Sequence, residues 1–342
     1  MDSMSAGAPT KCSTVTAGLG PRRGVTPVDA PLVLRTAIGS YGHTEPLKDG
    51  TVRSDRLRLE HVEVEPVNRA FRRMIRDSEF DVCEMAITTH VVARSFDKPI
   101  TALPIVLYRG FPHGAIACRT DGPLRMVSDL AGRRIGVRAY SQTTGVWARG
   151  IVARDYGIDL DRLTWIVLEG SHVEEYQDPP NVERAAAGRD LRAMLLSGEI
   201  DAAVGLGQLD SPRVETLIPD PEAAAASWYG RKGVYPINHL VVVRSELLEA
   251  HPWLADELVS MFTAAKDQYL ARLRSAGPAS PEDETCLRQM AIVGDDPLPY
   301  GIEPNRAAVE MLADFAVEQR LAPRAYSVEE LIHTAGPLQP FS

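Results

Sequence analysis

Short apolar runs alternate with amphipathic stretches along most of the chain. The apolar runs predict strands at 31–38, 56–64, 80–85, 105–108, 115–118, 133–140, 163–170, 201–207 and 239–243. Apolar residues at helical spacing predict helices at 67–80, 88–96, 141–157, 189–200, 252–277 and 303–323, and residues 169–190 read as a long irregular loop. Such alternation is typical of α/β proteins with mainly parallel sheets and helices on both faces.

Two turn-rich segments, 119–124 and 235–238, predict the points where the chain crosses between two lobes. We expect residues 30–118 plus 239–342 to form one lobe and residues 119–238 an inserted second lobe, with the substrate cleft between them. In α/β proteins ligands bind at the carboxyl ends of strands. Candidate residues are therefore sought in the loops after strands and at the crossings.

Composition narrows the possible partners. The 37 Lys and Arg against 46 Asp and Glu give a net charge of −9, which argues against nucleic acid or an anionic membrane as the main partner. The four cysteines lack paired spacing, so neither a zinc finger nor a disulfide framework is predicted. Residues 1–29 are polar and rich in Gly, Ser, Thr and Pro, which predicts a disordered leader. With no apolar run long enough for a signal peptide or a membrane span, we expect a cytoplasmic protein.

The segment 104–118, "PIVLYRGFPHGAIAC", places an Arg, an aromatic ring and a His between two apolar flanks. This pattern predicts a turn that faces the cleft. Arg109 is a candidate anchor for a carboxylate, because guanidinium binds carboxylates in bidentate geometry. His113 and His239, one near each crossing, are candidate proton donors, since His exchanges protons near neutral pH. The alternative for each histidine is a hydrogen-bonded structural role.

Glu84 ends a predicted buried strand, where a carboxylate needs a partner or a raised pKa. It is a candidate acid or base, and a structural hydrogen bond to a neighbouring loop is the alternative. Thr88 or Thr89 is expected to cap the helix that follows, and Thr88 is also a candidate substrate ligand.

The loop after the first strand, residues 39–47, offers Tyr41, His43 and Thr44 as candidate ligands, with a simple polar turn as the alternative. The segment 140–150 opens a helix, where free N–H groups and the helix dipole favour an anion. Ser141, Thr143 and Thr144 are candidates there, either for a ligand carboxylate or only for capping.

The histidines and cysteines suggest two further kinds of site. Four histidines and Glu84 could converge on a divalent metal, although no HxH or HExxH spacing supports this; they are His43, His90, His113 and His239. No GxSxG elbow is present, and Cys83 and Cys118 lie in apolar runs, so a Ser or Cys nucleophile is disfavoured. The other histidines, at positions 61, 172, 251 and 333, read as surface residues.

A set of motifs runs in order over roughly residues 33–334: "YGHTEPLKDGTV", "EFDVCEMAITTHVVAR", "LYRGFPHGAI", "GRRIGVRAYSQTTGVWARGIV", "LLSGEIDAAV", "GVYPINHLVVV", "HPWLADEL" and "PYGIEPNRAAVE". As an ordered set they resemble the 4,5-dihydroxyphthalate decarboxylase family. The resemblance implies a two-lobed fold like that of type II periplasmic solute-binding proteins. It also implies a cytoplasmic carboxy-lyase that acts on a dihydroxylated aromatic diacid without an organic cofactor. Positions that match the family motifs are Arg109, His113, Tyr140, Thr143, Thr144, Trp147, His239, Tyr300 and Arg306. On this resemblance Tyr140, Trp147, Tyr300 and Arg306 are added to the candidate substrate ligands.

Gly42 and His43 depart from the family pattern, in which an acidic residue and an Arg tend to stand between the Tyr and the Thr. This departure implies that the protein binds a different acid from the family's substrate, or that it binds the same acid through different contacts.

We therefore expect non-oxidative decarboxylation of a small aromatic carboxylate, with His113 or His239 protonating the ring carbon and Glu84 assisting. No cofactor or metal site is predicted, with a divalent metal held by His and Glu as the open alternative. The competing functions are a non-catalytic carboxylate-binding protein and an isomerase or hydrolase on the same scaffold. No motif indicates the oligomeric state, and a homo-oligomer stays open.

Overall fold

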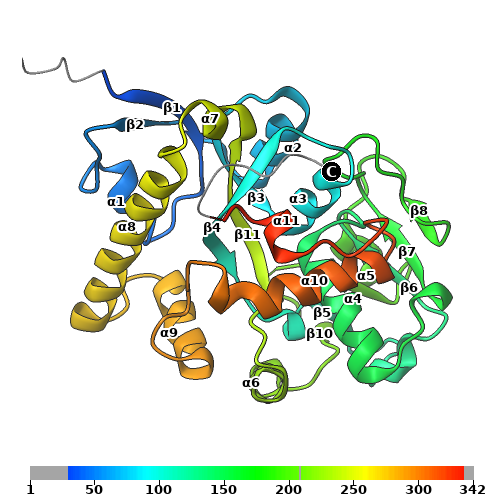
Figure 1. The fold of residues 1–342 in the computed structure, drawn as a ribbon. Helices are drawn as coiled ribbons and strands as arrows, with labels where there is room; N and C mark the ends of the chain where they lie inside the picture. Colours follow the sequence, from blue (N-terminus) through cyan, green and yellow to red (C-terminus); the bar gives the residue numbers. More distant parts are fainter. Residues whose placement is uncertain (1–29, 208, 335–342) are drawn as a thin grey trace, which may run out of the picture.

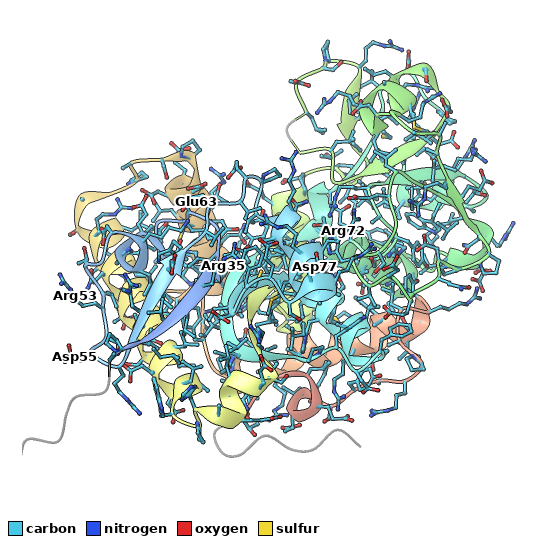
Figure 2. The ribbon with its side chains drawn as sticks, turned by 90° about the horizontal axis from the view of Figure 1, so that it is seen from above. Arg35, Arg53, Asp55, Glu63, Arg72 and Asp77 are labelled. Atoms are coloured by element: carbon cyan, nitrogen blue, oxygen red, sulfur yellow. The ribbon has the colours of Figure 1, made fainter. Side chains whose placement is uncertain are left out.

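A computed structural model of the protein describes residues 30–207 and 209–334, so the expected leader over residues 1–29 lies outside the described residues. Two β-sheets lie side by side and are covered by helices (Figure 1). Figure 2, seen from above, shows Arg35 of the first sheet on one side and the green elements of the second sheet on the other. Within the described part of the chain, no helix is long and apolar enough to cross a membrane.

The first sheet has five strands, in the order β2 (Leu57–His61), β1 (Leu32–Ala37), β3 (Val82–Ala86), β11 (Ile237–Arg244) and β4 (Ile100–Arg109). Strands β1, β2 and β3 are parallel, and β11 runs against both β3 and β4. Alternate residues of β4 are buried on opposite faces, as the pleat requires. Leu103 and Leu107 pack with residues of α8, whereas Ala102 and Val106 belong to the core that includes α2 and α3.

The second sheet has six strands, in the order β10 (Val214–Thr216), β5 (Ile116–Arg119), β9 (Ala202–Val204), β6 (Arg134–Val137), β7 (Thr164–Val167) and β8 (Val182–Arg184). Strands β6, β7, β8 and β9 pair in parallel, and β5 runs against both of its neighbours, β9 and β10. The expected two-lobed α/β fold with mainly parallel sheets is confirmed, with one reversed strand in each sheet. Each reversed strand, β5 and β11, is the first strand after the chain crosses to a new sheet.

The chain crosses between the sheets slightly earlier than the sequence suggested. After β4 it passes through the 3-10 helix η1 (Pro112–Gly114) into β5, which already belongs to the second sheet from residue 116. It returns to the first sheet with β11, which begins at residue 237. The expected boundaries at 118/119 and 238/239 therefore lie two or three residues inside strands of the sheet the chain has already joined.

Helices connect the strands and cover the sheets: α1 (Glu45–Lys48), α2 (Asn68–Asp77), α3 (Ile87–Arg94), α4 (Thr143–Tyr156), α5 (Leu191–Ser197), α6 (Pro221–Lys232), α7 (Ser245–Ala250), α8 (Leu254–Ala276), α9 (Pro281–Val293), α10 (Arg306–Glu318) and α11 (Val328–Leu331). Helices α1, α6, α9 and α11 and strands β8 and β10 were not predicted. Strand β8 lies within the segment 169–190 that was expected to be irregular. Its residues are partly or fully exposed, so it carries no apolar run that would mark a strand.

Helices α4 and α10 pack closely beside the second sheet. The indole ring of Trp147 meets the ring of Phe315 edge to face, with centroids 5.6 Å apart. Gly150 makes this approach possible, because a Cβ atom at that position would lie 2.2 Å from the Phe315 ring. Helix α10 thereby fixes the position of α4, beside which it runs (Figure 1).

Candidate active site

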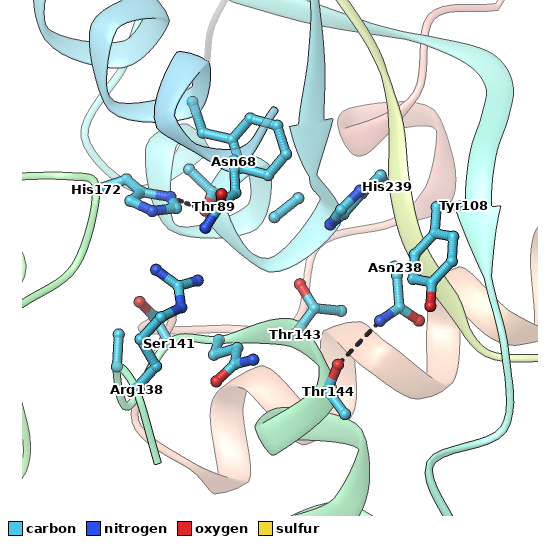
Figure 3. A pocket seen from close by; sticks show the side chains of 14 residues that line it. Asn68, Thr89, Tyr108, Arg138, Ser141, Thr143, Thr144, His172, Asn238 and His239 are labelled. Carbon is cyan, nitrogen blue, oxygen red and sulfur yellow. Dashed lines mark hydrogen bonds between the residues drawn. The ribbon is translucent and has the colours of Figure 1, made fainter. Parts of the chain in front are cut away.

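A cavity of about 230 Å³ lies between the two sheets, near the ends of their strands. Both lobes line it, as Figure 3 shows: the first with Asn68, Phe71, Ala86, Thr89, Tyr108, Asn238 and His239, and the second with Arg138, Ala139, Ser141, Gln142, Thr143, Thr144 and His172. None of these residues carries a carboxylate. A second hollow, of about 310 Å³, adjoins it and shares Tyr108, Gln142, Thr144 and Asn238.

His239 is held at the cavity wall by a buried carboxylate. Its Nδ1 atom lies 2.6 Å from Oε1 of Glu84, whose side chain is 0% exposed at the centre of the first sheet. The Tyr41 hydroxyl donates to the same oxygen at 2.7 Å, and the Gly39 N–H donates to Oε2 at 2.8 Å. Since an ionised carboxylate only accepts, Nδ1 carries the proton and Nε2 is left for the cavity.

The hydrogen bonds keep Glu84 ionised despite its burial. Burial alone would raise the pKa of this carboxyl, but the hydrogen bond and charge of His239, with the donors of Gly39 and Tyr41, lower it below its ordinary value. Burial and the neighbouring Glu84 charge raise the pKa of Tyr41 above its ordinary range, so its hydroxyl remains a donor. Glu84 therefore places a fixed negative charge next to Nδ1 of His239, on the side of the ring away from the cavity.

Aromatic rings set the orientation of His239. The Phe71 ring meets the imidazole edge to face at 5.0 Å, and the Tyr108 ring lies 5.4 Å from it. The Tyr41 ring stacks between His43 and Tyr108, with centroid distances of 5.3 and 6.3 Å. The imidazole is therefore fixed by packing as well as by its hydrogen bond.

The first turn of α4 forms the opposite wall of the cavity. Helix α4 begins at Thr143 with Gln142 in the N-cap position and no side-chain cap, so the proposed cap by Ser141 is not formed. Its first N–H groups have no partner within the helix and favour an anion. The Asn238 amide donates to the Thr144 hydroxyl at 3.1 Å, which joins this turn to β11 (Figure 3).

Thr88 connects the two lobes instead of capping a helix. Helix α3 begins at Ile87 with Ala86 in the N-cap position, so neither Thr88 nor Thr89 is its cap. The Thr88 hydroxyl lies 2.8 Å from the Ser141 carbonyl oxygen and 2.6 Å from the Thr143 hydroxyl. Thr88, on α3 of the first lobe, therefore fixes the start of α4 by these two hydrogen bonds.

His172 is buried in the cavity wall, which corrects its expected place on the surface. Its Nδ1 lies 2.9 Å from the Thr89 hydroxyl, and its carbonyl oxygen accepts from Arg76 at 3.1 Å. Burial, followed by the charges of Arg138, Arg72 and Arg76, lowers the pKa of His172 to about 3. This imidazole is neutral at pH 7.

Arg109 and His113 do not line the main cavity. The Arg109 guanidinium donates to Asn305 Oδ1 at 2.8 Å and to the Tyr235 carbonyl oxygen, and it stacks 4.1 Å over the Tyr235 ring. The His113 ring packs edge to face against Trp228 at 5.6 Å, and burial lowers the pKa of His113 to about 4. Other residues of this segment do line the hollows between the lobes, with Tyr108 in both and Gly110, Phe111 and Pro112 in the second, but the two side chains predicted to act there point elsewhere.

Four other expected ligands are also used elsewhere. Tyr140 lies beneath the Arg149 guanidinium at 4.0 Å, and the Trp147 indole donates to the Ile237 carbonyl at 2.9 Å. Arg306 forms exposed ion pairs with Glu303 and Glu329. The half-buried Tyr300 ring lies beside Lys266, whose Nζ lies 4.5 Å from its centroid.

The first loop serves the cavity through Tyr41. The Thr44 hydroxyl donates to the Gly39 carbonyl and accepts from the Tyr41 N–H, which shapes the loop. His43 is buried behind Tyr41, and burial lowers its pKa to about 4. Gly42 is required there, because a Cβ atom would lie 2.2 Å from the Tyr269 ring.

The histidines that were considered as metal ligands do not gather. His239 alone of the four touches Glu84, while the His90 Nε2 atom binds the Leu331 carbonyl at 2.7 Å. Across residues 30–207 and 209–334, no three His, Cys, Asp or Glu side chains are placed to hold a metal ion.

The sequence reading missed several lining residues. Arg138 directly follows β6, so the rule that ligands gather after strands could have found it. Asn68 and Phe71 lie on the helix predicted at 67–80, for which no functional role was expected, and Asn238 lies beside the expected His239. His172 had no local signal, because only its contact with α3 brings it into the cavity.

The chain was compared with known proteins. No family model matches it. A 4,5-dihydroxyphthalate decarboxylase of Comamonas testosteroni is 31% identical over 327 residues, which cover 89% of this chain and 97% of that protein. A protein of the same name from Pseudomonas putida is 32% identical over 211 residues, covering 58% and 81%. The periplasmic aliphatic sulphonate binding protein of Escherichia coli has a TM-score of 0.54 at 14% identity, covering 88% of this chain and 97% of that one. That likeness shows the fold alone, which is that of periplasmic binding proteins.

Proposed function

This chain belongs to the family of 4,5-dihydroxyphthalate decarboxylases and is a carboxy-lyase, and we propose that it decarboxylates 4,5-dihydroxyphthalate or a closely related hydroxylated aromatic diacid. The observation that carries the proposal is the Glu84–His239 pair, with Nε2 of His239 facing a cavity free of carboxylates. The cytoplasmic location expected from the sequence forms part of the proposal.

The chemistry requires a proton at the ring carbon that loses its carboxylate. The hydroxyl para to that carbon, once ionised, pushes electron density into the ring. The imidazolium of His239 gives its Nε2 proton to this carbon, and the phenolate oxygen becomes a carbonyl. The bond to the carboxylate then breaks, its electron pair restores the aromatic ring and the phenolate, and carbon dioxide leaves. The phenolate regains a proton, so the reaction consumes one proton overall.

Glu84 acts on this step through His239. Its Oε1 accepts the hydrogen bond from Nδ1, which lies 2.6 Å away, and this bond orients the ring and stabilises the imidazolium that must donate. The packing of Phe71 and Tyr108 keeps Nε2 aimed at the same place. We assign the donor role to His239 rather than His113, because His113 packs against Trp228 away from the cavity.

The start of α4 is the proposed site for the carboxylate that departs. Its free N–H groups face the cavity across from His239, where a carboxylate and the carbon that bears it would lie between the two walls. The hydroxyls and amides of Thr144, Asn238 and Asn68 are available for the ring hydroxyls. Arg109 has no part in this scheme, because it does not line the cavity and its two terminal nitrogens donate to Asn305 and Tyr235.

The test is incubation of the protein with 4,5-dihydroxyphthalate, followed by detection of carbon dioxide and of a product about 44 Da lighter. His239→Asn should lower kcat by at least about 10²-fold. His113→Gln is the matched control, and it should stay within about 3-fold of the wild type as long as circular dichroism shows the native fold. Equal turnover by both folded variants would remove His239 as the donor. Binding of dihydroxyphthalate isomers without any loss of mass would instead favour a non-catalytic binding protein.

A further inference from the structure

Arg138 lies in the cavity wall with part of its guanidinium free. The residue follows β6 directly, and its carbonyl oxygen accepts hydrogen bonds from the N–H groups of Leu168 and Glu169, each at 3.0 Å. These bonds fix its backbone to the chain that leaves β7. Figure 3 shows its side chain reaching into the cavity toward His172.

Glu169 occupies one edge of this guanidinium only. It accepts from Nη1 of Arg138, whose side chain is 33% exposed. Nε and Nη2 of Arg138, which together form the side-on edge of a guanidinium, have no hydrogen-bond partner among the residues that the structure describes. That edge is the one that binds a carboxylate through two parallel hydrogen bonds.

Glu169 pairs with two arginines, Arg138 and Arg72, so this group of three side chains carries a net charge of +1. Its second oxygen lies 3.3 Å from Arg72 on α2, so a single carboxylate is shared by two guanidiniums. Figure 2 labels Arg72 where α2 meets the second lobe. His172, beside them, has its pKa lowered to about 3 by burial and by these arginines, so it adds no charge of its own. No acidic residue lines the cavity, so a carboxylate of a bound ligand would supply the negative charge that Arg138 and Arg72 lack.

We infer that Arg138 is a specificity-determining residue that binds the second carboxylate of the substrate, the one that the product keeps. The inference rests on the proposed function, since it supplies the anchor for a diacid whose other carboxylate leaves beside His239. It restricts the substrate class to aromatic acids that carry a carboxylate in addition to the one that is lost. Arg138 and His239 then face the substrate from different lobes, so both lobes must contact it for the reacting carbon to be held.

The inference is tested with two dihydroxylated aromatic compounds that differ only by the carboxylate that Arg138 is proposed to bind. Loss of one carboxylate from 4,5-dihydroxyphthalate yields 3,4-dihydroxybenzoate, and catechol is the same ring without any carboxylate. Binding of each is measured by calorimetry, with no turnover required. The wild type should bind 3,4-dihydroxybenzoate more tightly than catechol. Arg138→Gln should weaken binding of the acid by about 10-fold to 100-fold and change catechol binding by less than about 2-fold.

Arg138→Lys keeps the charge and loses the paired geometry, so it should fall between the wild type and Arg138→Gln. The control is Arg134→Gln, which removes an exposed arginine of β6 that pairs with Glu183 and should leave both affinities unchanged. The inference is overturned if the wild type does not discriminate between the two compounds. It is also overturned if the folded Arg138 variants discriminate as well as the wild type. Release of carbon dioxide from 4,5-dihydroxyphthalate by the wild type is scored separately, so failure of the proposed function remains distinguishable.

Discussion

Replacing Glu84 by glutamine removes a buried negative charge while nearly preserving the size of the side chain. The glutamine oxygen can still accept from Tyr41 and His239, because both bind the same carboxylate oxygen, Oε1. The amide nitrogen then stands where Oε2 accepts the Gly39 N–H, so two donors face each other. The variant therefore loses the charge behind His239 and gains a local conflict with the first loop.

The size of the effect can be bounded from this geometry. A hydrogen bond to a charged group contributes about 1 kcal/mol more than a neutral one, which sets the lower limit. Two unit charges about 4 Å apart at an effective dielectric constant of about 20 attract by about 4 kcal/mol, which sets the upper limit. Because about 1.4 kcal/mol corresponds to a tenfold change in rate, kcat should fall by about 5-fold to about 10³-fold.

The assay is the initial rate of carbon dioxide release at saturating 4,5-dihydroxyphthalate, with circular dichroism to verify folding. Glu183→Gln makes the same chemical change at a glutamate that is 54% exposed and paired with Arg134 on the surface. It should keep kcat within about 2-fold of the wild type, since exposed ion pairs contribute little. A folded Glu84→Gln protein with wild-type kcat would refute the reasoning, because His239 would then donate its proton without a charged partner.

The remaining predictions concern stability and the first loop. Burial lowers the pKa of His113 to about 4. Between pH 6.5 and 4 the unfolded chain therefore binds a proton at this residue and the folded chain does not, so the free energy of unfolding decreases as the pH falls through this range. His113→Phe should reduce the slope of the unfolding free energy against pH in that range by about 1.4 kcal/mol per unit, and an unchanged slope in urea titrations would contradict this. Gly150→Ala should destabilise the protein by about 1–3 kcal/mol, because the added Cβ atom would clash with Phe315 of α10. The control is Gly230→Ala in α6, where the added Cβ atom meets open space and should stabilise the protein by about 0.5–1 kcal/mol. Equal urea midpoints for the two variants would rule out the clash. Tyr41→Phe removes one donor to Glu84 and should lower kcat by about 2-fold to 10-fold, a loss that should be absent if the first loop only shapes the cavity.

Periodicity found most of the elements that form both sheets. The apolar run at 31–38 is β1, and the amphipathic pattern at 141–157 is α4, which ends at Gly157 with the positive φ of 69° that a left-handed C-cap needs. Strand β8 and helix α9 escaped prediction for different reasons. The first exists through its pairing with β7, and the second buries only Asp283 fully, so neither shows a strong apolar pattern in its own sequence.

Local composition could not show which side chains of the segment 104–118 face the cleft. The segment lines the second hollow, but the partners of Arg109 and His113 hold these two side chains outside both hollows. Arg109 is bound by Asn305, which is 196 residues away in the sequence, and by Tyr235, which is 126 residues away. No pattern within the segment carries information on partners so distant, and these contacts direct Arg109 and His113 away from the cavity.

The order of apolar and polar residues determined the α/β class, the positions of the main strands and the loops in which functional groups were to be sought, because those features depend on neighbours along the chain. The ordered motifs determined the family. Tertiary structure alone decided that His239 faces the cavity, since the carboxylate that holds it lies 155 residues away on an adjacent strand. It likewise decided that His172 is buried and that Arg138 keeps an unpaired edge, because burial and charge balance at these positions arise only when α2 and α3 of one lobe meet the loops of the other.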